Sequence, residues 1–186
     1  MKLFLSCFCF AWLYAGLAMA EPYAVIQDQS RIEFQGTHAG QKFIGTFDDW
    51  KADIDFDKDA PEKSKVEIII DMTSASTGNA LYDGTLPQPD WFNTAEYPQA
   101  VFTTTSIQNL APGQYRAEGQ LTIKDKTAPV AFEFTLDDQN AASTRMQADL
   151  SLDRLAFDIG SKSDPNAEWV SKDMKITINI IAEKAK

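Results

Sequence analysis

The chain has 186 residues, with 17 basic and 27 acidic side chains and a formal net charge of −10. This length suits one domain that is large enough to bury a substantial core. The negative charge argues against nucleic acid or an anionic membrane as the partner, because both are themselves negative.

The first 20 residues have the pattern of an export signal. Lys2 precedes an apolar run from Leu3 to Met19, and the run ends in Ala18-Met19-Ala20, a small-x-small cleavage pattern. This predicts a signal peptide over 1–20, cut after Ala20, and a mature domain over 21–186. A membrane anchor is the alternative, because the run is nearly long enough to span a bilayer. Cleavage would remove Cys7 and Cys9, so the mature domain would hold no cysteine.

The rest of the chain alternates between apolar and polar residues, and this period of two is typical of strands with one buried face. Such strands are expected around 23–26, 31–35, 43–47, 53–57, 65–71, 101–106, 115–123, 130–137, 145–152 and 175–180. Turn residues separate them, as in Ala111-Pro112-Gly113 and the predicted tight hairpin Lys124-Asp125-Lys126-Thr127. The pattern therefore predicts an all-β sandwich or barrel.

Two segments lack this alternation. The stretch 73–98 contains three prolines, and we expect a short helix near 79–86 followed by an irregular loop. The stretch 161–171 is a second predicted loop, with Trp169 near its end. Loops of this length in a compact domain are often binding loops or lids.

The alternation alone does not say which way the apolar face points. A soluble barrel directs that face inward, whereas an outer-membrane barrel directs it toward lipid. The charged tail Ala182-Glu183-Lys184-Ala185-Lys186 and the absence of a terminal aromatic residue favour the soluble form. An eight-stranded barrel can be filled by side chains or hold one small ligand.

Catalytic motifs are scarce. The only histidine, His38, lies in the turn-like sequence Gly36-Thr37-His38-Ala39-Gly40, and no serine has a G-x-S-x-G setting. Asp53, Asp55, Asp57 and Asp59 have the spacing of part of a calcium loop, but Lys58 replaces its glycine and Ser64 its final glutamate. An outward strand face explains the same spacing. We expect no metal, no cofactor and no catalytic residue, and a binding protein is favoured over an enzyme.

Several segments together resemble the YceI-like family over essentially the whole mature chain. The resemblance rests on Ser30–Phe34, His38, Gly45–Phe47, Ile54–Asp57, Asp71–Asn79, Asp83, Leu86, Pro89–Phe92, Glu96–Pro98, Phe102, Gly119–Ile123, Arg154–Gly160 and Trp169. There are two departures: Lys124-Asp125 occupies a turn that usually holds glycine, and Gln29 stands where histidine is common.

The resemblance implies a lipocalin-like, extended antiparallel barrel of about eight strands, with a short helix and a long loop between strands. It also implies a periplasmic protein that encloses a long apolar ligand such as a polyisoprenoid, a quinone or a fatty amide. It carries over no catalytic residues. Transient membrane contact for ligand exchange and a homodimer are both compatible with this reading, and no nucleic acid is expected.

We therefore predict a lipid-binding or carrier protein whose inward-facing side chains line a tunnel. The predicted ligand-binding residues are Phe34, His38, Phe47, Phe56, Ile68, Trp91, Phe92, Phe102, Leu121, Ile123, Phe132, Phe134, Leu150, Trp169 and Ile178, with Trp91, Phe92 and Trp169 at or over the mouth. Two alternatives stay open. One is an enzyme for an isoprenoid or lipid substrate that uses His38 or an acidic pair; the other is a stress-response interaction protein with a packed barrel.

Overall fold

The structure is a computed structural model that describes residues 22–138 and 143–184, so the predicted signal peptide lies outside the described residues. Within them, one sheet contains β1 (Pro22–Val25), β2 (Arg31–His38), β3 (Gln41–Phe47), β4 (Trp50–Asp55), β5 (Lys65–Asp71), β6 (Ala75–Ser76), β7 (Gln99–Ala111), β8 (Gln114–Ile123), β9 (Lys126–Asp138), β10 (Ser143–Asp153) and β11 (Asp173–Lys184). The helix α1 covers Ala80–Thr85, and short 3₁₀ helices cover Gln27–Gln29, Pro61–Lys63, Met72–Ser74 and Arg154–Phe157.

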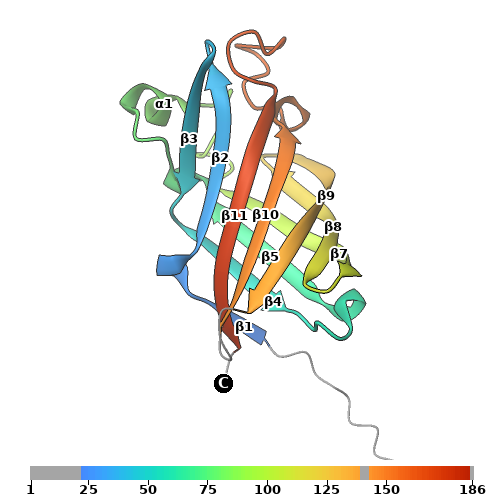
Figure 1. Ribbon diagram of the computed structural model, residues 1–186. Helices are drawn as coiled ribbons and strands as arrows, with labels where there is room; N and C mark the ends of the chain where they lie inside the picture. The colour runs from blue at the N-terminus through green and yellow to red at the C-terminus, as the bar shows by residue number, and fades with distance from the viewer. Residues whose placement is uncertain (1–21, 139–142, 185–186) are drawn as a thin grey trace, which may run out of the picture.

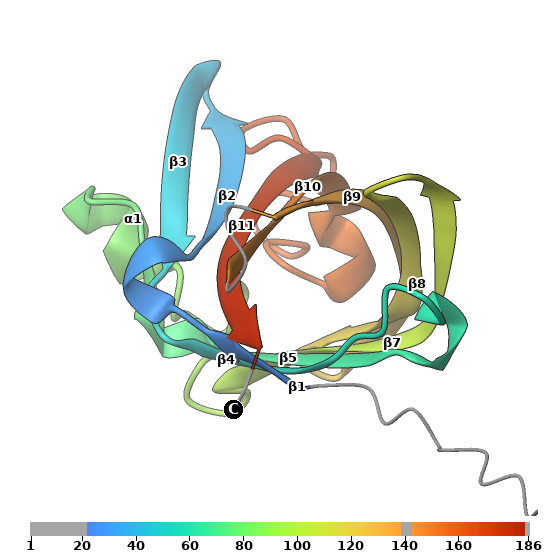
Figure 2. The same cartoon turned by 60° about the horizontal axis from the view of Figure 1, so that its bottom comes forward.

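These segments combine into eight long antiparallel strands, because three strands are each interrupted once. β1 and β2 both pair with β11, and they pair respectively with β4 and β3. β3 in turn pairs with β6, and β4 pairs with β5. The consecutive strands β1 and β2, β3 and β4, and β5 and β6 therefore each form one bent strand. The pairing of the first strand with β11 closes the sheet into a barrel (Figures 1 and 2). The predicted barrel of about eight strands is confirmed.

Tight turns fix the register of the hairpins. Ala39 and Gly40, between β2 and β3, both have positive φ values, 49° and 77°. The predicted hairpin at Lys124-Asp125 is also present, with Lys124 at a φ of 57°. Positive φ at both central residues, as at Ala39-Gly40, matches the right-handed twist of the flanking strands. The predicted boundaries were less accurate, because β7 and β9 extend well beyond 101–106 and 130–137 to pair along the whole of β8.

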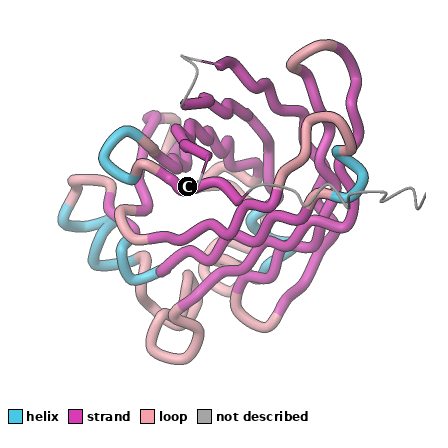
Figure 3. Tube along the Cα trace, turned by 90° about the horizontal axis from the view of Figure 1, so that it is seen from below, coloured by secondary structure: helices cyan, strands magenta, loops and turns pink. Residues whose placement is uncertain are grey.

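The apolar face of the sheet points into the barrel. Phe34, Ile68, Phe102 and Phe132, for example, are each at most 8% exposed and belong to one continuous core. Their sequence neighbours alternate outward, which is the period of two that the sequence showed. The tube in Figure 3, seen along the barrel from below, shows the strands winding around this interior.

Two glycines make room for phenylalanine rings inside the barrel. Gly45 is paired with Phe34 across β2 and β3, and a Cβ atom at Gly45 would lie 2.2 Å from the Phe34 ring. Gly119 on β8 accommodates Phe102 in the same way, at 2.6 Å. Each ring therefore occupies the space that a side chain at the glycine would need.

We expect Gly45→Ala to destabilise the protein by about 1–3 kcal/mol, because the new methyl group must displace the buried Phe34 ring. Gly84→Ala is the matched control. Gly84 lies in α1 with nothing within 4 Å of an added Cβ, so this change should stabilise by about 0.5–1 kcal/mol. Urea denaturation of both variants measures the difference. Equal effects of the two substitutions would contradict the proposed ring contact.

The two ends of the barrel differ. The β2–β3 hairpin, α1 and the segment 154–172 gather at one end, at the top of Figure 1, whereas β1 and the end of β11 lie at the other. Of the described residues, no helix has the length and apolar character needed to cross a membrane. The elements at the first end position the site described next.

Candidate functional site

A cavity of about 150 Å³ lies inside the barrel, and its wall is apolar. It lies among the residues of strands β2, β3, β5, β7, β8, β9, β10 and β11, with further contributions from the segments 86–92 and 154–170. The predicted residues that line it are Phe34, Phe47, Ile68, Trp91, Phe92, Phe102, Leu121, Ile123, Phe132, Leu150 and Ile178. Such a wall can exclude water but offers a ligand little hydrogen bonding, so it suits a hydrocarbon chain.

A second cavity of about 80 Å³ continues the lumen toward the β1 end. Its lining includes the predicted residues Phe56 and Phe134, which contact each other with ring centroids 6.3 Å apart. Ile68, Phe102 and Phe132 line both cavities and therefore form the constriction between them. Side chains rather than backbone separate the two spaces, so rotamer changes could join them.

A third cavity of about 190 Å³ forms the mouth at the opposite end. It lies between the β2–β3 hairpin and α1, and its lining includes His38 and Tyr82. Phe43, Leu86, Trp91 and Val170 line both this cavity and the main one, so they form a second constriction. The three cavities thus follow one another from the mouth to the far end of the barrel.

The structure places fourteen of the fifteen predicted ligand-binding residues on one of these cavities. Trp169 is the exception, because its side chain is 62% exposed and lines none of the three. Phe92 was predicted at the mouth but is buried beside the main cavity. Contact of these residues with a ligand stays a prediction.

Several lining residues were missed by the sequence reasoning. Ile70 and Ile176 share strand faces with Ile68 and Ile178, so the alternation could have identified them. Phe157 and Ile159 come from an irregular segment and carry no such signal. Tyr82 lies on α1, a helix too short to show a reliable apolar face.

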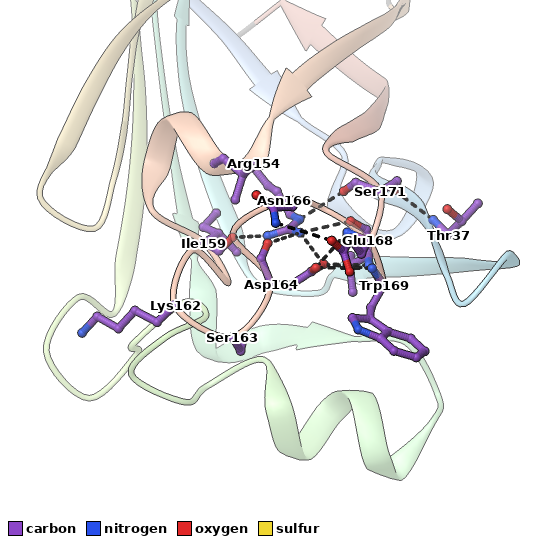
Figure 4. A network of polar contacts seen from close by, with 12 residues as sticks. Thr37, Arg154, Ile159, Lys162, Ser163, Asp164, Asn166, Glu168, Trp169 and Ser171 are labelled. Atoms are coloured by element: carbon purple, nitrogen blue, oxygen red, sulfur yellow. Dashed lines mark hydrogen bonds and ion pairs between the residues drawn. The ribbon is translucent and has the colours of Figure 1, made fainter.

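A buried ion pair holds the segment 154–172 over this end of the barrel (Figure 4). Arg154 Nη2 lies 2.7 Å from Asp164 Oδ2, and the two side chains are only 2% and 7% exposed. The guanidinium also donates to the backbone carbonyls of Ser171, Ile159, Asp164 and Val170. One arginine thus donates to four carbonyls of an irregular loop, of which the Asp164 carbonyl also accepts from the N–H of Ala167.

The Asp164 carboxylate is held in its charged form. Burial raises its pKa, but the N–H groups of Val170, Glu168 and Trp169 donate to it and the Arg154 charge lies beside it. The net result is a pKa below the ordinary value for aspartate. The indole of Trp169 points away from this network, as Figure 4 shows, so the residue contributes its backbone here.

We expect this carboxylate to add a pH-dependent component to stability. Because its folded pKa is lowered, its contribution is complete above the ordinary aspartate pKa of about 3.9 and is lost as the pH falls through the folded value. Asp164→Asn should therefore lower the free energy of unfolding more at pH 7 than at pH 3. Urea titrations of both proteins at the two pH values measure this. A constant difference would contradict it.

A second contact joins this segment to the loop after α1. The carboxylate of Asp90 accepts from the N–H groups of Lys162 and Ser163, and its carbonyl accepts from Gly160. Arg154 also lies 5.8 Å from the centre of the Trp91 ring. The two irregular segments of the sequence therefore support each other at the mouth and position Trp91 at the constriction.

The residues that line the three cavities include no aspartate or glutamate in the part of the chain that the structure describes. Asp57 is engaged in a turn, where its carboxylate accepts from the N–H of Asp59 and its own N–H donates to the Ser64 hydroxyl. Across residues 22–138 and 143–184, no group of three or more His, Cys, Asp or Glu side chains is arranged to hold a metal ion.

Comparisons with known proteins agree with this architecture. The chain is 32% identical over 130 residues to a UPF0312 protein of Pseudomonas savastanoi pv. phaseolicola, and this alignment covers 68% of each chain. It is 35% identical over 125 residues to the protein YceI of Escherichia coli O157:H7, and this alignment covers 66% of this chain and 65% of that one.

Solved structures share the fold. BcnA of Burkholderia cenocepacia matches with a TM-score of 0.81 at 25% identity, over 85% of this chain and 99% of that one. A polyisoprenoid-binding domain of Saccharophagus degradans matches with a TM-score of 0.69 at 13% identity, over 90% and 99% of the two chains. The family model for the YceI-like domain matches residues 23–182, nearly the whole described region. The chain therefore belongs to the YceI-like family.

Proposed function

We propose that this protein is a periplasmic binding or carrier protein that encloses a long apolar lipid, a polyisoprenoid or a prenylated quinone, in its barrel. The observation that carries the proposal is the row of apolar cavities inside a closed barrel, which opens at a mouth with polar groups. Burial of each CH₂ group gains about 0.8 kcal/mol, so a long chain would be strongly retained in this lumen. The polyisoprenoid-binding domain of Saccharophagus degradans, which shares the fold, supports the choice of ligand class.

The size of the cavities indicates how such a chain would lie. The main and distal cavities, at about 150 and 80 Å³, are each smaller than a typical pocket for a drug-sized ligand, which is about 300–1,000 Å³. A long chain would have to run through both and displace the side chains of Ile68, Phe102 and Phe132 between them. This requires an extended, flexible ligand rather than a compact one.

Lipid extraction tests the proposal directly. The mature protein is purified without detergent and extracted with organic solvent, and the extract is analysed by mass spectrometry. We expect an isoprenoid lipid in a fixed ratio to protein. If the native protein yields no lipid and also takes up none from vesicles that contain a prenylated quinone, the proposal is wrong. Amino-terminal sequencing of the exported protein tests cleavage after Ala20, and light scattering tests for a homodimer.

The enzyme alternative rests on His38, whose Nδ1 lies 3.0 Å from Tyr82 Oη. A general base usually needs a partner that orients it, and here that partner is a phenol at the mouth rather than a carboxylate. The described cavity walls supply no acidic pair for the other version of this mechanism. The geometry therefore favours binding over catalysis.

We further propose that the mouth touches a membrane when ligand is exchanged. Leu81 on α1 is 70% exposed and Trp169 is 62% exposed, and the carbonyl of Trp169 accepts from Ala39 at the tip of the β2–β3 hairpin. Exposed apolar and indole side chains around an opening are suited to the water–lipid boundary. The acidic net charge favours a surface of neutral lipids.

Leu81→Ser combined with Trp169→Ser should slow quinone transfer between phosphatidylcholine vesicles several-fold, because the mouth would lose its apolar contact with the bilayer. The binding constant for the quinone should change less than the transfer rate, since neither side chain lines the main cavity and only Leu81 lines the mouth cavity. Leu110→Ser is the control, because Leu110 is 48% exposed and lies near the β7–β8 turn, away from the mouth. A transfer rate that responds equally to all three changes would contradict membrane contact at this end.

A further inference from the structure

The mouth cavity contains a pair of polar rings, His38 and Tyr82, and its other polar lining residues are Thr77 and Thr85. His38 Nδ1 and Tyr82 Oη lie 3.0 Å apart, and the two rings meet edge to face with centroids 5.3 Å apart. Both line the mouth cavity. Across the described residues, His38 Nε2 makes no hydrogen bond with the protein.

The fold holds each member of this pair in place. His38 ends β2, where it forms a bridge with Val170 and precedes the tight Ala39-Gly40 turn. Tyr82 lies on α1, which begins at the cap Asn79, whose side chain accepts from the N–H of Leu81. The ring of Tyr82 also packs against Phe43 at 5.7 Å. The pair is thus supported from both sides of the mouth.

The same helix is fastened to the sheet by Asp83. Its carboxylate accepts from the N–H and the hydroxyl of Thr77, both at 2.7 Å. These hydrogen bonds lower the pKa of Asp83 below its ordinary value. The negative charge on α1 is therefore present at neutral pH; Asp83 does not line the mouth cavity itself, but its partner Thr77 does.

Either neutral tautomer of His38 leaves the pair with one donor and one acceptor for a ligand. If Nδ1 accepts the Tyr82 proton, the phenol oxygen can still accept and Nε2–H can donate. If Nδ1–H donates instead, the phenol proton is available and Nε2 can accept. A hydroxyl group of the ligand can pair with both the donor and the acceptor of the His38–Tyr82 pair, whereas a carbonyl oxygen can pair only with the donor.

The mouth offers no matching charge for an anionic headgroup. Among the described residues, its lining contains no lysine or arginine. Arg154 lines the main cavity, but it is paired with Asp164 and with four carbonyls. Lys42 is on the same hairpin as His38, but it alternates with Phe43 and does not line the cavity.

We propose that the His38–Tyr82 pair is a headgroup site that selects a neutral lipid with a hydroxyl or carbonyl group and disfavours one with a phosphate. This rests on the proposed function, because the headgroup is held here only if the tail occupies the lumen. The continuity of the mouth cavity with the main cavity, through Phe43, Leu86, Trp91 and Val170, gives a single ligand access to both.

Three probes of equal chain length test the site: geranylgeraniol, geranylgeranyl diphosphate and a hydrocarbon without a headgroup. Quenching of tryptophan fluorescence reports binding, since Trp91 lies at the constriction. The wild type should bind the alcohol at least about tenfold more tightly than the diphosphate. Tyr82→Phe and His38→Gln should each weaken the alcohol about 5–10-fold, the loss expected for one hydrogen bond, and leave the hydrocarbon unchanged.

Thr85→Val is the matched control, because Thr85 also lines the mouth but its hydroxyl already donates to the Leu81 carbonyl. It should not alter the alcohol's affinity. Diphosphate binding as tight as alcohol binding, or equal losses for alcohol and hydrocarbon in the two variants, would overturn the headgroup site while lipid binding stands. If none of the three probes binds, the proposed function fails together with it.

Discussion

Arg154→Met should lower the free energy of unfolding by about 3–5 kcal/mol, the cost of leaving a buried partner charge uncompensated. The substitution removes the donor to Asp164 Oδ2 and to four backbone carbonyls at once. Methionine can fill much of the apolar space that the arginine stem occupies, so the loss measures the polar contacts more than the packing. Chemical denaturation at pH 7 measures it.

Arg116→Met is the matched control. Arg116 pairs with Glu118 at 3.3 Å, but both side chains are 40% exposed or more. Exposed ion pairs contribute about 0–1 kcal/mol, so this variant should be nearly as stable as the wild type. Equal losses in the two variants would mean that the Arg154 network adds nothing beyond an ordinary surface pair. If Arg154→Met does not fold, Asp164→Asn, which keeps the arginine and its carbonyl contacts, provides a milder measurement.

The strands and their inward faces could be predicted because the signal is repeated. Phe132 and Phe134 on β9, or Ile176 and Ile178 on β11, alternate with polar residues over enough positions to fix the face. The number of such strands and the lack of helices between most of them predict a sandwich or a barrel, and the family resemblance favours the barrel. The breaks after 23–26 and after 65–71 could also be predicted. The short strand β6, which continues β5 beyond the 3₁₀ turn at 72–74, could not, because two residues are too few to show an alternation.

The mouth was harder to predict because it is built from irregular segments. Trp169 was expected at or over the mouth as a ligand-binding residue. Its backbone N–H donates to the Asp164 carboxylate, and its ring faces solvent. Arg154 and Asp164 are ten residues apart with no periodic relation, so only the folded loop brings them together. His38 was recognised as the only histidine, but its partner Tyr82 depends on where α1 packs.

A side chain that fills the lumen should abolish lipid binding without removing the fold. Val130 on β9 lines the main cavity and is paired with Gly119, the bare position against which the Phe102 ring lies. Val130→Trp would place an indole into the cavity of about 150 Å³, beside the constriction. We expect at least a tenfold loss of co-purified lipid. Overpacking should cost about 1–3 kcal/mol of stability.

Ala131→Trp is the matched control, because Ala131 is the next residue on the same strand and its side chain is exposed. It adds the same indole to the outer face, so lipid content and stability should stay near those of the wild type.

The two variants also distinguish a lipid carrier from the alternative, an interaction protein with a packed barrel. A protein that acts through its outer surface would keep its cellular role in Val130→Trp and lose it when Ala131 or a neighbouring outward residue is replaced by Trp. A lipid carrier would lose its role in Val130→Trp and keep it in Ala131→Trp. Unchanged lipid content in Val130→Trp would place the ligand outside the barrel and contradict the proposed function.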